Sequence, residues 1–126
     1  MGIGRIVGHQ SAAAGSVGAL SPDALDELVA GVDVATAEVR VVCADGAGAV
    51  VAEGRARLPA PERPRPGWSE QEPAAWWPAV ASALRDATDA LGPRARALVA
   101  VAVSATSGTV VVVDDEGSPI GPALLY

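Results

Sequence analysis

The segment VAGVDVATAEVRVVCADGAGAVVAEGRARL, residues 29–58, decides the fold of this chain. Its apolar run at 29–34 predicts a buried strand, and the runs at 38–44 and 50–58 predict two more. Asp45-Gly46, between the second and third runs, favours a hairpin because glycine takes positive φ angles at no steric cost. Three successive strands joined by tight turns predict an antiparallel meander.

The rest of the chain predicts one helix and two further strands. The prolines of PAPERPRP (59–66) favour an extended connector, since proline fixes φ and lacks a backbone donor. A helix is expected from Glu72-Pro73 to about Leu91, with a kink or a late start at Pro78. Apolar strands are expected at 97–103 and 109–114. The helix should bury an apolar face made of Trp76, Val80, Ala83, Leu84, Ala87 and Leu91, and Trp77 is expected in the core or in domain packing.

The expected order of elements, β-β-β-α-β-β, resembles that of a ribonuclease-H-like, actin-like ATPase half-domain. In this α/β fold the right-handed crossover rule sets the strand at 97–103 parallel to the strand at 29–34. We therefore expect a mixed five-stranded sheet in an incomplete half-domain, because one helix covers only one face. Apolar sheet surface should be exposed, and the isolated chain should associate. Residues 1–28 are expected to form a flexible leader with a short helix that opens at Ser21, and 29–126 the folded part.

Composition argues against several classes of function. The 126 residues carry 15 acidic and 9 basic side chains, which gives a formal net charge of −6. This balance argues against a nucleic-acid partner and an anionic membrane surface, because both need clustered positive charge. The chain has one cysteine, Cys43, and one histidine, His9. A disulfide within the chain is therefore excluded, and most metal sites and catalytic triads lack the residues that they need. No apolar run reaches the roughly 18 residues of a membrane helix. Without a secretory signal at the N-terminus, a cytoplasmic location is expected.

The stretch GVDVATAEVR (31–40) is the strongest candidate for chemistry. Asp33 ends a buried strand, and small residues and the hydroxyl of Thr36 follow it. Backbone N–H groups at such a turn can point at phosphate oxygens, and small side chains allow close approach. A carboxylate there can hold Mg²⁺, which prefers few carboxylates together with phosphates. The alternative interpretation is a hairpin in which Asp33 only caps the turn.

The chain resembles the N-terminal part of the FGGY family of carbohydrate kinases, which are actin-like, ATP-dependent sugar kinases. The TSGT form of one block is similar to the ribulokinase- and xylulokinase-like branch. The resemblance implies phosphorylation of a hydroxyl of a pentulose or related sugar, with ATP and Mg²⁺ as cofactors. Five segments carry it, namely GVDVATAEVR (31–40), DGAGAVVAEG (45–54), PGWSEQEPAAWW (66–77), VAVSATSGTVVVVDDEG (101–117) and PIGPALLY (119–126).

The resemblance also assigns roles to single residues. Asp33 matches the Mg²⁺-associated acid of the first phosphate loop, Thr36 the loop threonine, and Arg40 the basic residue that ends this ATP-binding motif. A second loop matches the part of the family that faces the sugar substrate, and its residues are Thr106, Ser107, Gly108 and Thr109. Trp68, Glu70 and Gln71 match the segment before the helix, where a structural role is favoured over stacking on a sugar.

The chain departs from the family pattern at four positions. Ala35 and Ala105 replace usual glycines, and Ala37-Glu38 replaces a pair of hydroxyl residues. If Glu38 points toward a bound triphosphate, like-charge repulsion at ~4 Å costs about 4 kcal/mol at an effective dielectric constant of about 20.

The resemblance places the catalytic aspartate and a C-terminal kinase domain downstream of these residues. No catalytic residue is therefore expected within this chain, which should be inactive alone, and a homodimer is compatible with a full-length enzyme. The alternative is a non-catalytic truncated remnant, or an interaction module with an actin-like half-domain.

Overall fold

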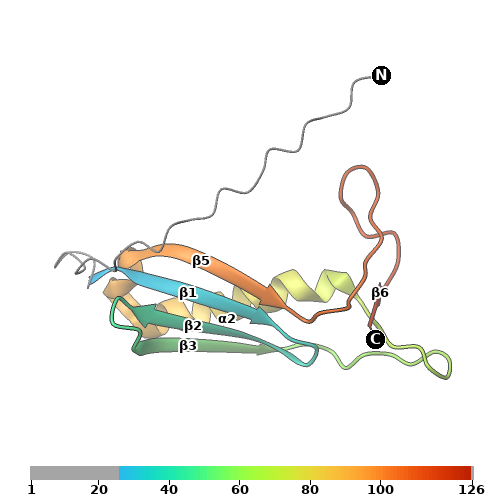
Figure 1. Cartoon of the computed structure of the whole chain (residues 1–126), viewed down its shortest axis with the longest axis horizontal. Coiled ribbons are helices and arrows are strands. Elements are labelled where there is room, and N and C mark those ends of the chain that lie inside the picture. Colours follow the sequence, from blue (N-terminus) through green and yellow to red (C-terminus); the bar gives the residue numbers. More distant parts are fainter. Residues whose placement is uncertain (1–25, 126) are drawn as a thin grey trace, which may run out of the picture.

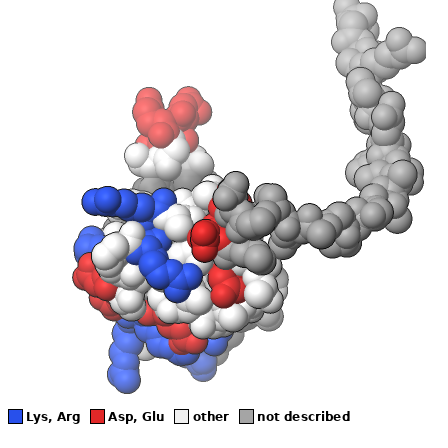
Figure 2. Space-filling view, turned by 90° about the vertical axis from the view of Figure 1, so that its left-hand side faces the viewer, with Lys and Arg blue, Asp and Glu red and all other residues white. Residues whose placement is uncertain are grey.

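The computed structural model describes residues 26–125 (Figure 1). Residues 1–25 of the expected leader, with most of its short helix, lie outside the described residues, whereas Leu28, the last residue expected in the leader, begins the first strand. Within residues 26–125, no helix has the length and apolar character that crossing a membrane requires. Figure 2 looks at the end of the domain where β1 begins, and basic and acidic side chains are intermingled over this surface.

The meander predicted from residues 29–58 is confirmed. It consists of β1 (Leu28–Val34), β2 (Glu38–Asp45) and β3 (Val50–Arg57), paired antiparallel in sequence order. A fourth strand, β5 (Leu98–Ala105), lies parallel to β1, as the crossover rule predicts. The main sheet therefore has the order β3-β2-β1-β5 and is mixed.

The crossover between β3 and β5 carries the predicted helix. A 3₁₀ turn at Pro73–Ala75 leads into α2 (Trp76–Leu91), and a second 3₁₀ segment, Gly92–Ala97, follows. Because α2 begins at Trp76, Pro78 lies in its first turn, where a missing N–H removes no intrahelical hydrogen bond. The helix thus starts late, which is one of the two expected outcomes.

The core lies between α2 and one face of the sheet, where alternate residues of β1 and β2 are buried. The helix contributes Ala79, Ala83, Ala87 and Leu91 to this interface. The seam is tight, since a Cβ built on Gly54 of β3 would lie 2.0 Å from the backbone oxygen of Ala83. Trp77 is 71% exposed, so it does not lie in the core, and its alternative role in domain packing stays a prediction. At 100° per residue it lies about 200° around the helix from Ala79, away from the sheet.

Part of the sheet's apolar surface is exposed, as predicted. Val101 and Val103 of β5 pair in register with buried Ala30 and Val32, so they share the face that α2 covers. The helix packs mainly on β3 and β2 and only slightly on β1. Val101 and Val103 are consequently 60% and 71% exposed.

The prediction of a fifth strand at 109–114 is wrong, because the main sheet formed by the described residues has four strands rather than five. Gly108, at a φ of 75°, lies in the turn that follows the end of β5. The backbone of Val110 then exchanges hydrogen bonds of 2.9 and 2.8 Å with Leu124. Farther out, the Ile120 N–H donates to the Val112 carbonyl at 3.0 Å, which makes a projecting ribbon (Figure 1). A separate pair joins β4 (Glu70–Gln71) to β6 (Ala123–Leu124).

Candidate functional site

A cavity of about 210 Å³ lies where the parallel strands β1 and β5 end. The carboxyl edge of parallel strands is the usual place for a ligand in open α/β sheets. The cavity is smaller than the roughly 300–1,000 Å³ of drug-sized pockets, so it suits a small metabolite. Its lining is mostly apolar, with three threonines and a glutamine, and consists of Val34, Ala35, Thr36, Gln71, Trp76, Ala105, Thr106, Thr109, Val111 and Leu125.

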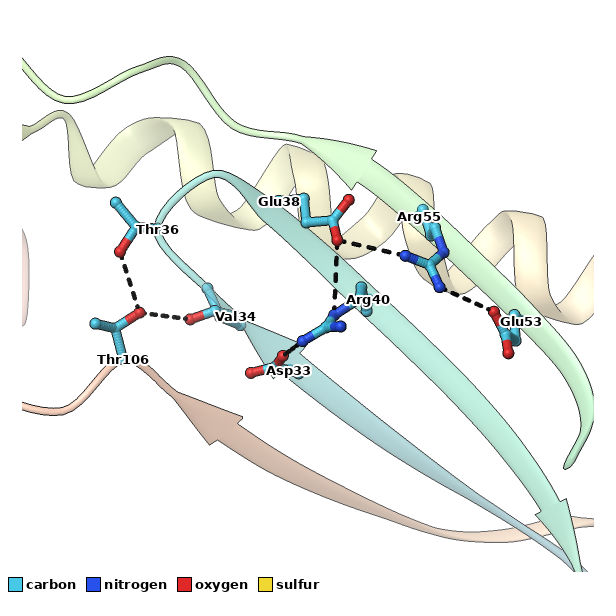
Figure 3. Close-up of polar contacts among 8 residues, drawn as sticks. All are labelled: Asp33, Val34, Thr36, Glu38, Arg40, Glu53, Arg55 and Thr106. Carbon is cyan, nitrogen blue, oxygen red and sulfur yellow. Dashed lines mark hydrogen bonds and ion pairs between the residues drawn. The ribbon is translucent and has the colours of Figure 1, made fainter.

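The cavity brings together three of the predicted site residues from two loops. The hydroxyl oxygens of Thr36 and Thr106 are 3.5 Å apart, and the Thr106 hydroxyl donates to the Val34 carbonyl at 3.4 Å (Figure 3). The hydroxyl of Thr109 is buried and has no hydrogen-bond partner among the described residues. A buried polar group without a partner costs free energy, so a ligand hydroxyl that paired with it would be stabilised.

Ser107 and Gly108 lie in the same loop but do not line the cavity. Ser107 is exposed, and Gly108 supplies the positive φ of the turn. The predicted sugar-facing tetrad is therefore split, with Thr106 and Thr109 at the cavity and the two residues between them turned outward.

Gln71 holds the wall of the cavity in place. Its side-chain amide is buried and donates to the backbone carbonyls of Thr36 at 3.0 Å and Pro59 at 2.8 Å. Its amide oxygen accepts a hydrogen bond from the Trp76 indole at 3.0 Å. The structural role favoured for Gln71 thus takes the form of a clamp that joins the β1–β2 turn to the start of α2. Trp68 is 47% exposed, with the Arg65 guanidinium 5.0 Å from its ring centre.

Asp33 and Arg40 lie outside the cavity, on the face of the sheet that α2 does not cover. The two residues are partners in the β1–β2 register, and Arg40 Nη2 donates to Asp33 Oδ2 at 2.6 Å (Figure 3). This hydrogen bond, followed by the charge of the carboxylate, raises the pKa of the Arg40 guanidinium above its ordinary value. Alternation of side chains along β1 explains the separation, because Val34 faces the cavity and its neighbour Asp33 faces away.

Glu38 belongs to the same outer face and does not line the cavity. Its carboxylate lies 3.7 Å from Arg40 Nε and 3.4 Å from Arg55 Nη1, and Arg55 in turn lies 3.2 Å from Glu53 (Figure 3). Two guanidinium groups thus offset the charge that could have repelled a phosphate. Glu38 therefore does not line the cavity and shares the outer face with Asp33 and Arg40.

The β1–β2 turn also accepts alanine in place of glycine. Among the described residues no residue other than glycine has a positive φ, so Ala35 lies in an ordinary backbone conformation. Its N–H donates to the Glu38 carbonyl at 3.1 Å, which closes the turn.

The donor set around Asp33 is compatible with Mg²⁺. In residues 26–125 no three His, Cys, Asp or Glu side chains gather into a metal-binding group. Mg²⁺ bound with a nucleotide needs only one or two carboxylates, because phosphate oxygens and water complete its octahedron. The Asp33 side chain is 39% exposed, and Arg40 is its present partner.

Comparison with known proteins identifies the family. Residues 28–126 match the model of the FGGY family of carbohydrate kinases, N-terminal domain. Over 101 residues the chain is 37% identical to a xylulose kinase of Streptomyces coelicolor, covering 79% of this chain and 19% of that protein. It is 34% identical over 100 residues to a glycerol kinase of Allorhizobium ampelinum, covering 79% of this chain and 20% of that one.

Solved structures agree with the expected half-domain. A xyloylose kinase from Brucella ovis superposes with a TM-score of 0.74 at 28% identity, covering 79% of this chain and 21% of that one. A xylulose kinase from Rhodospirillum rubrum superposes with a TM-score of 0.72 at 26% sequence identity, covering 78% of this chain and 20% of that one. The chain thus spans about a fifth of the length of these relatives. The actin-like α/β fold is confirmed, and this chain belongs to the FGGY family of carbohydrate kinases through its N-terminal domain.

Proposed function

We propose that residues 29–126 are the N-terminal portion of a xylulokinase-like enzyme that phosphorylates a hydroxyl of a pentulose or related sugar with ATP. The observation that supports this most is the cavity at the ends of β1 and β5, where the buried Thr109 hydroxyl has no hydrogen-bond partner within residues 26–125. The family match and the xylulose kinases among the relatives support the substrate class.

The sugar binds in the threonine-lined cavity. Its hydroxyl groups pair with the side chains of Thr106 and Thr109, while Trp76 and Val111 supply apolar walls for its C–H faces. Gln71 keeps Trp76 and the Thr36 turn at a fixed separation, since it bonds to both. A rigid wall of this kind holds a reacting hydroxyl in a productive position, which contributes much of the rate of phosphoryl transfer.

The nucleotide phosphates bind at the β1–β2 turn, beside the sugar. Asp33 holds Mg²⁺, Thr36 bonds to a phosphate oxygen, and Arg40 offsets phosphate charge. When bound, Mg²⁺ neutralises the charge that develops on the transferred group. The sugar oxygen attacks the γ-phosphorus, the bond between that phosphorus and the ADP oxygen breaks, and the proton of the sugar hydroxyl passes to a general base. We assign that base and the adenosine site to the part of the family protein that these residues do not cover, so the chain alone does not complete the reaction.

Two finer features belong to the same proposal. We propose that the enzyme acts in the cytoplasm, where both sugars and ATP are present. A homodimer is the oligomeric state to test in a full-length enzyme. The relatives are kinases of small sugars and polyols, which supports the first of these.

Saturation-transfer NMR with D-xylulose and the full chain tests the sugar site. Thr109→Val removes the buried hydroxyl and should abolish transfer to the sugar, whereas Ser107→Ala, at an exposed neighbour outside the cavity, should leave it unchanged. Equal transfer in the wild type and in Thr109→Val would refute this assignment of the cavity. No transfer in any of the three proteins would favour the non-catalytic alternative.

A further inference from the structure

Arg40 lies between two carboxylates on the outer face of the sheet. Its Nη2 is 2.6 Å from Asp33 Oδ2, and its Nε is 3.7 Å from Glu38 Oε1 (Figure 3). Asp33 is the cross-strand partner of Arg40, and Glu38 precedes Arg40 by two positions on the same strand. All three side chains therefore point to one face.

A divalent cation and a guanidinium group compete for the same carboxylate. If Mg²⁺ binds Asp33, as the proposed function requires, the positive charge of Arg40 opposes it at contact distance. Arg40 must then leave Asp33 or weaken cation binding. Glu38 is already beside the guanidinium, so a small rotation of the Arg40 side chain exchanges one carboxylate for the other.

Glu38 can accept Arg40 because Arg55, the other ion-pair partner of Glu38, can pair with Glu53 instead. Arg55 Nη1 lies 3.4 Å from Glu38, and Arg55 Nη2 lies 3.2 Å from Glu53. Arg55 therefore keeps one ion pair when Glu38 turns to Arg40. The side chains in this row are between 36% and 56% exposed, so no exchange requires a buried charge to be left alone.

We propose that Glu38 is a positioning residue that takes Arg40 from Asp33 when a divalent cation binds, and so favours cation binding. This rests on the proposed function, which assigns the cation to Asp33. It gives a role to a residue that stands where the family pattern has a hydroxyl.

Mn²⁺ is the probe for the test, because its paramagnetism broadens the amide signals of nearby residues in ¹⁵N NMR spectra of the full chain. In the wild type, broadening should centre on Asp33, and Asp33→Asn should remove it. Arg40→Gln should tighten Mn²⁺ binding, because the competing cation is gone. Glu38→Gln should weaken it by about twofold to fivefold, the equivalent of one exposed ion pair.

The double variant separates this mechanism from simple attraction between charges. If Glu38 acts by holding Arg40, Glu38→Gln should have little effect on Mn²⁺ affinity in the Arg40→Gln background. Glu53→Gln, which removes the same charge from the far end of the row, is the matched control and should change affinity less than Glu38→Gln in the wild-type background.

Three results would overturn the exchange. An equal loss of Mn²⁺ affinity from Glu38→Gln with and without Arg40 would reduce Glu38 to a source of attraction, and weaker binding in Arg40→Gln would show that Arg40 does not compete. Both of these leave the cation site at Asp33 intact. Broadening that does not depend on Asp33 would instead remove the proposed metal site and the exchange with it.

Discussion

Replacing Gly54 by alanine tests the seam between the sheet and α2. The added Cβ would lie 2.0 Å from the Ala83 oxygen and 2.7 Å from the Ala87 nitrogen, and both are helix backbone atoms that no side-chain rotation can move. Ordinary contact begins near 3.4 Å, so the helix must retreat by about 1.4 Å at this point. Overpacking of a well-packed core costs about 1–3 kcal/mol. With rigid backbone as the obstacle, we expect Gly54→Ala to cost about 3 kcal/mol.

Urea unfolding followed by tryptophan fluorescence measures this loss. In a domain of about 100 residues, a loss of about 3 kcal/mol lowers the midpoint of thermal unfolding by roughly 12–24 °C. Gly31→Ala is the matched control, because Gly31 is also in a strand but a Cβ there meets nothing within 4 Å. That variant should be neutral or slightly stabilising. If the two variants have the same free energy of unfolding, the close approach of α2 to β3 does not limit packing, and the reasoning fails.

Three further predictions concern the clamp, the thiol and the exposed strand. Gln71→Leu leaves the Thr36 and Pro59 carbonyls and the Trp76 indole without partners, so urea unfolding should show a loss of about 2–4 kcal/mol; an unchanged midpoint would contradict the clamp. Burial raises the pKa of the Cys43 thiol, so the folded state favours the protonated form. The free energy of unfolding should therefore fall as pH rises above about 9, the thiol's ordinary pKa, and Cys43→Ala should flatten that fall. Val101→Lys with Val103→Glu should convert an associating chain to a monomer in sedimentation experiments. Continued association of this double variant would show that β5 is not the associating surface.

The meander and helix could be predicted because each depends on local chemistry. Asp45-Gly46 specifies its own hairpin, in which the Asp45 side chain accepts hydrogen bonds from the N–H groups of Ala47 and Ala49. The pairing of residues 109–114 could not be predicted, because an apolar run indicates extended backbone but does not show which segment pairs with it. Leu124, far along the chain, supplies that partner for Val110. Gly108 was the local signal that the sheet ends there.

The site was predictable in its residue types and less so in its geometry. Thr36 and Thr106 come together because their loops follow parallel neighbouring strands, a relation that the crossover rule already contains. The network of Gln71 depends on contacts with residues 12 and 35 positions away, which no local pattern reports. The pairing of Asp33 with Arg40 needed the β1–β2 register, and only the structure supplies it.

The contact of Gly54 with α2 has a consequence for how this sequence can change over time. The chain has no phenylalanine, and its helix meets the sheet through Ala79, Ala83 and Ala87, so main chains touch where other proteins would interpose large side chains. At a position already occupied by glycine, every substitution adds atoms, and an alanine opposite can only shrink to glycine. Protein cores usually change by exchanging a large residue for a small one at one position and the reverse at its neighbour. The contact between Gly54 and α2 allows almost no exchange of this kind. We therefore expect these few positions to vary least among descendants of this domain, even though none of them lines the cavity.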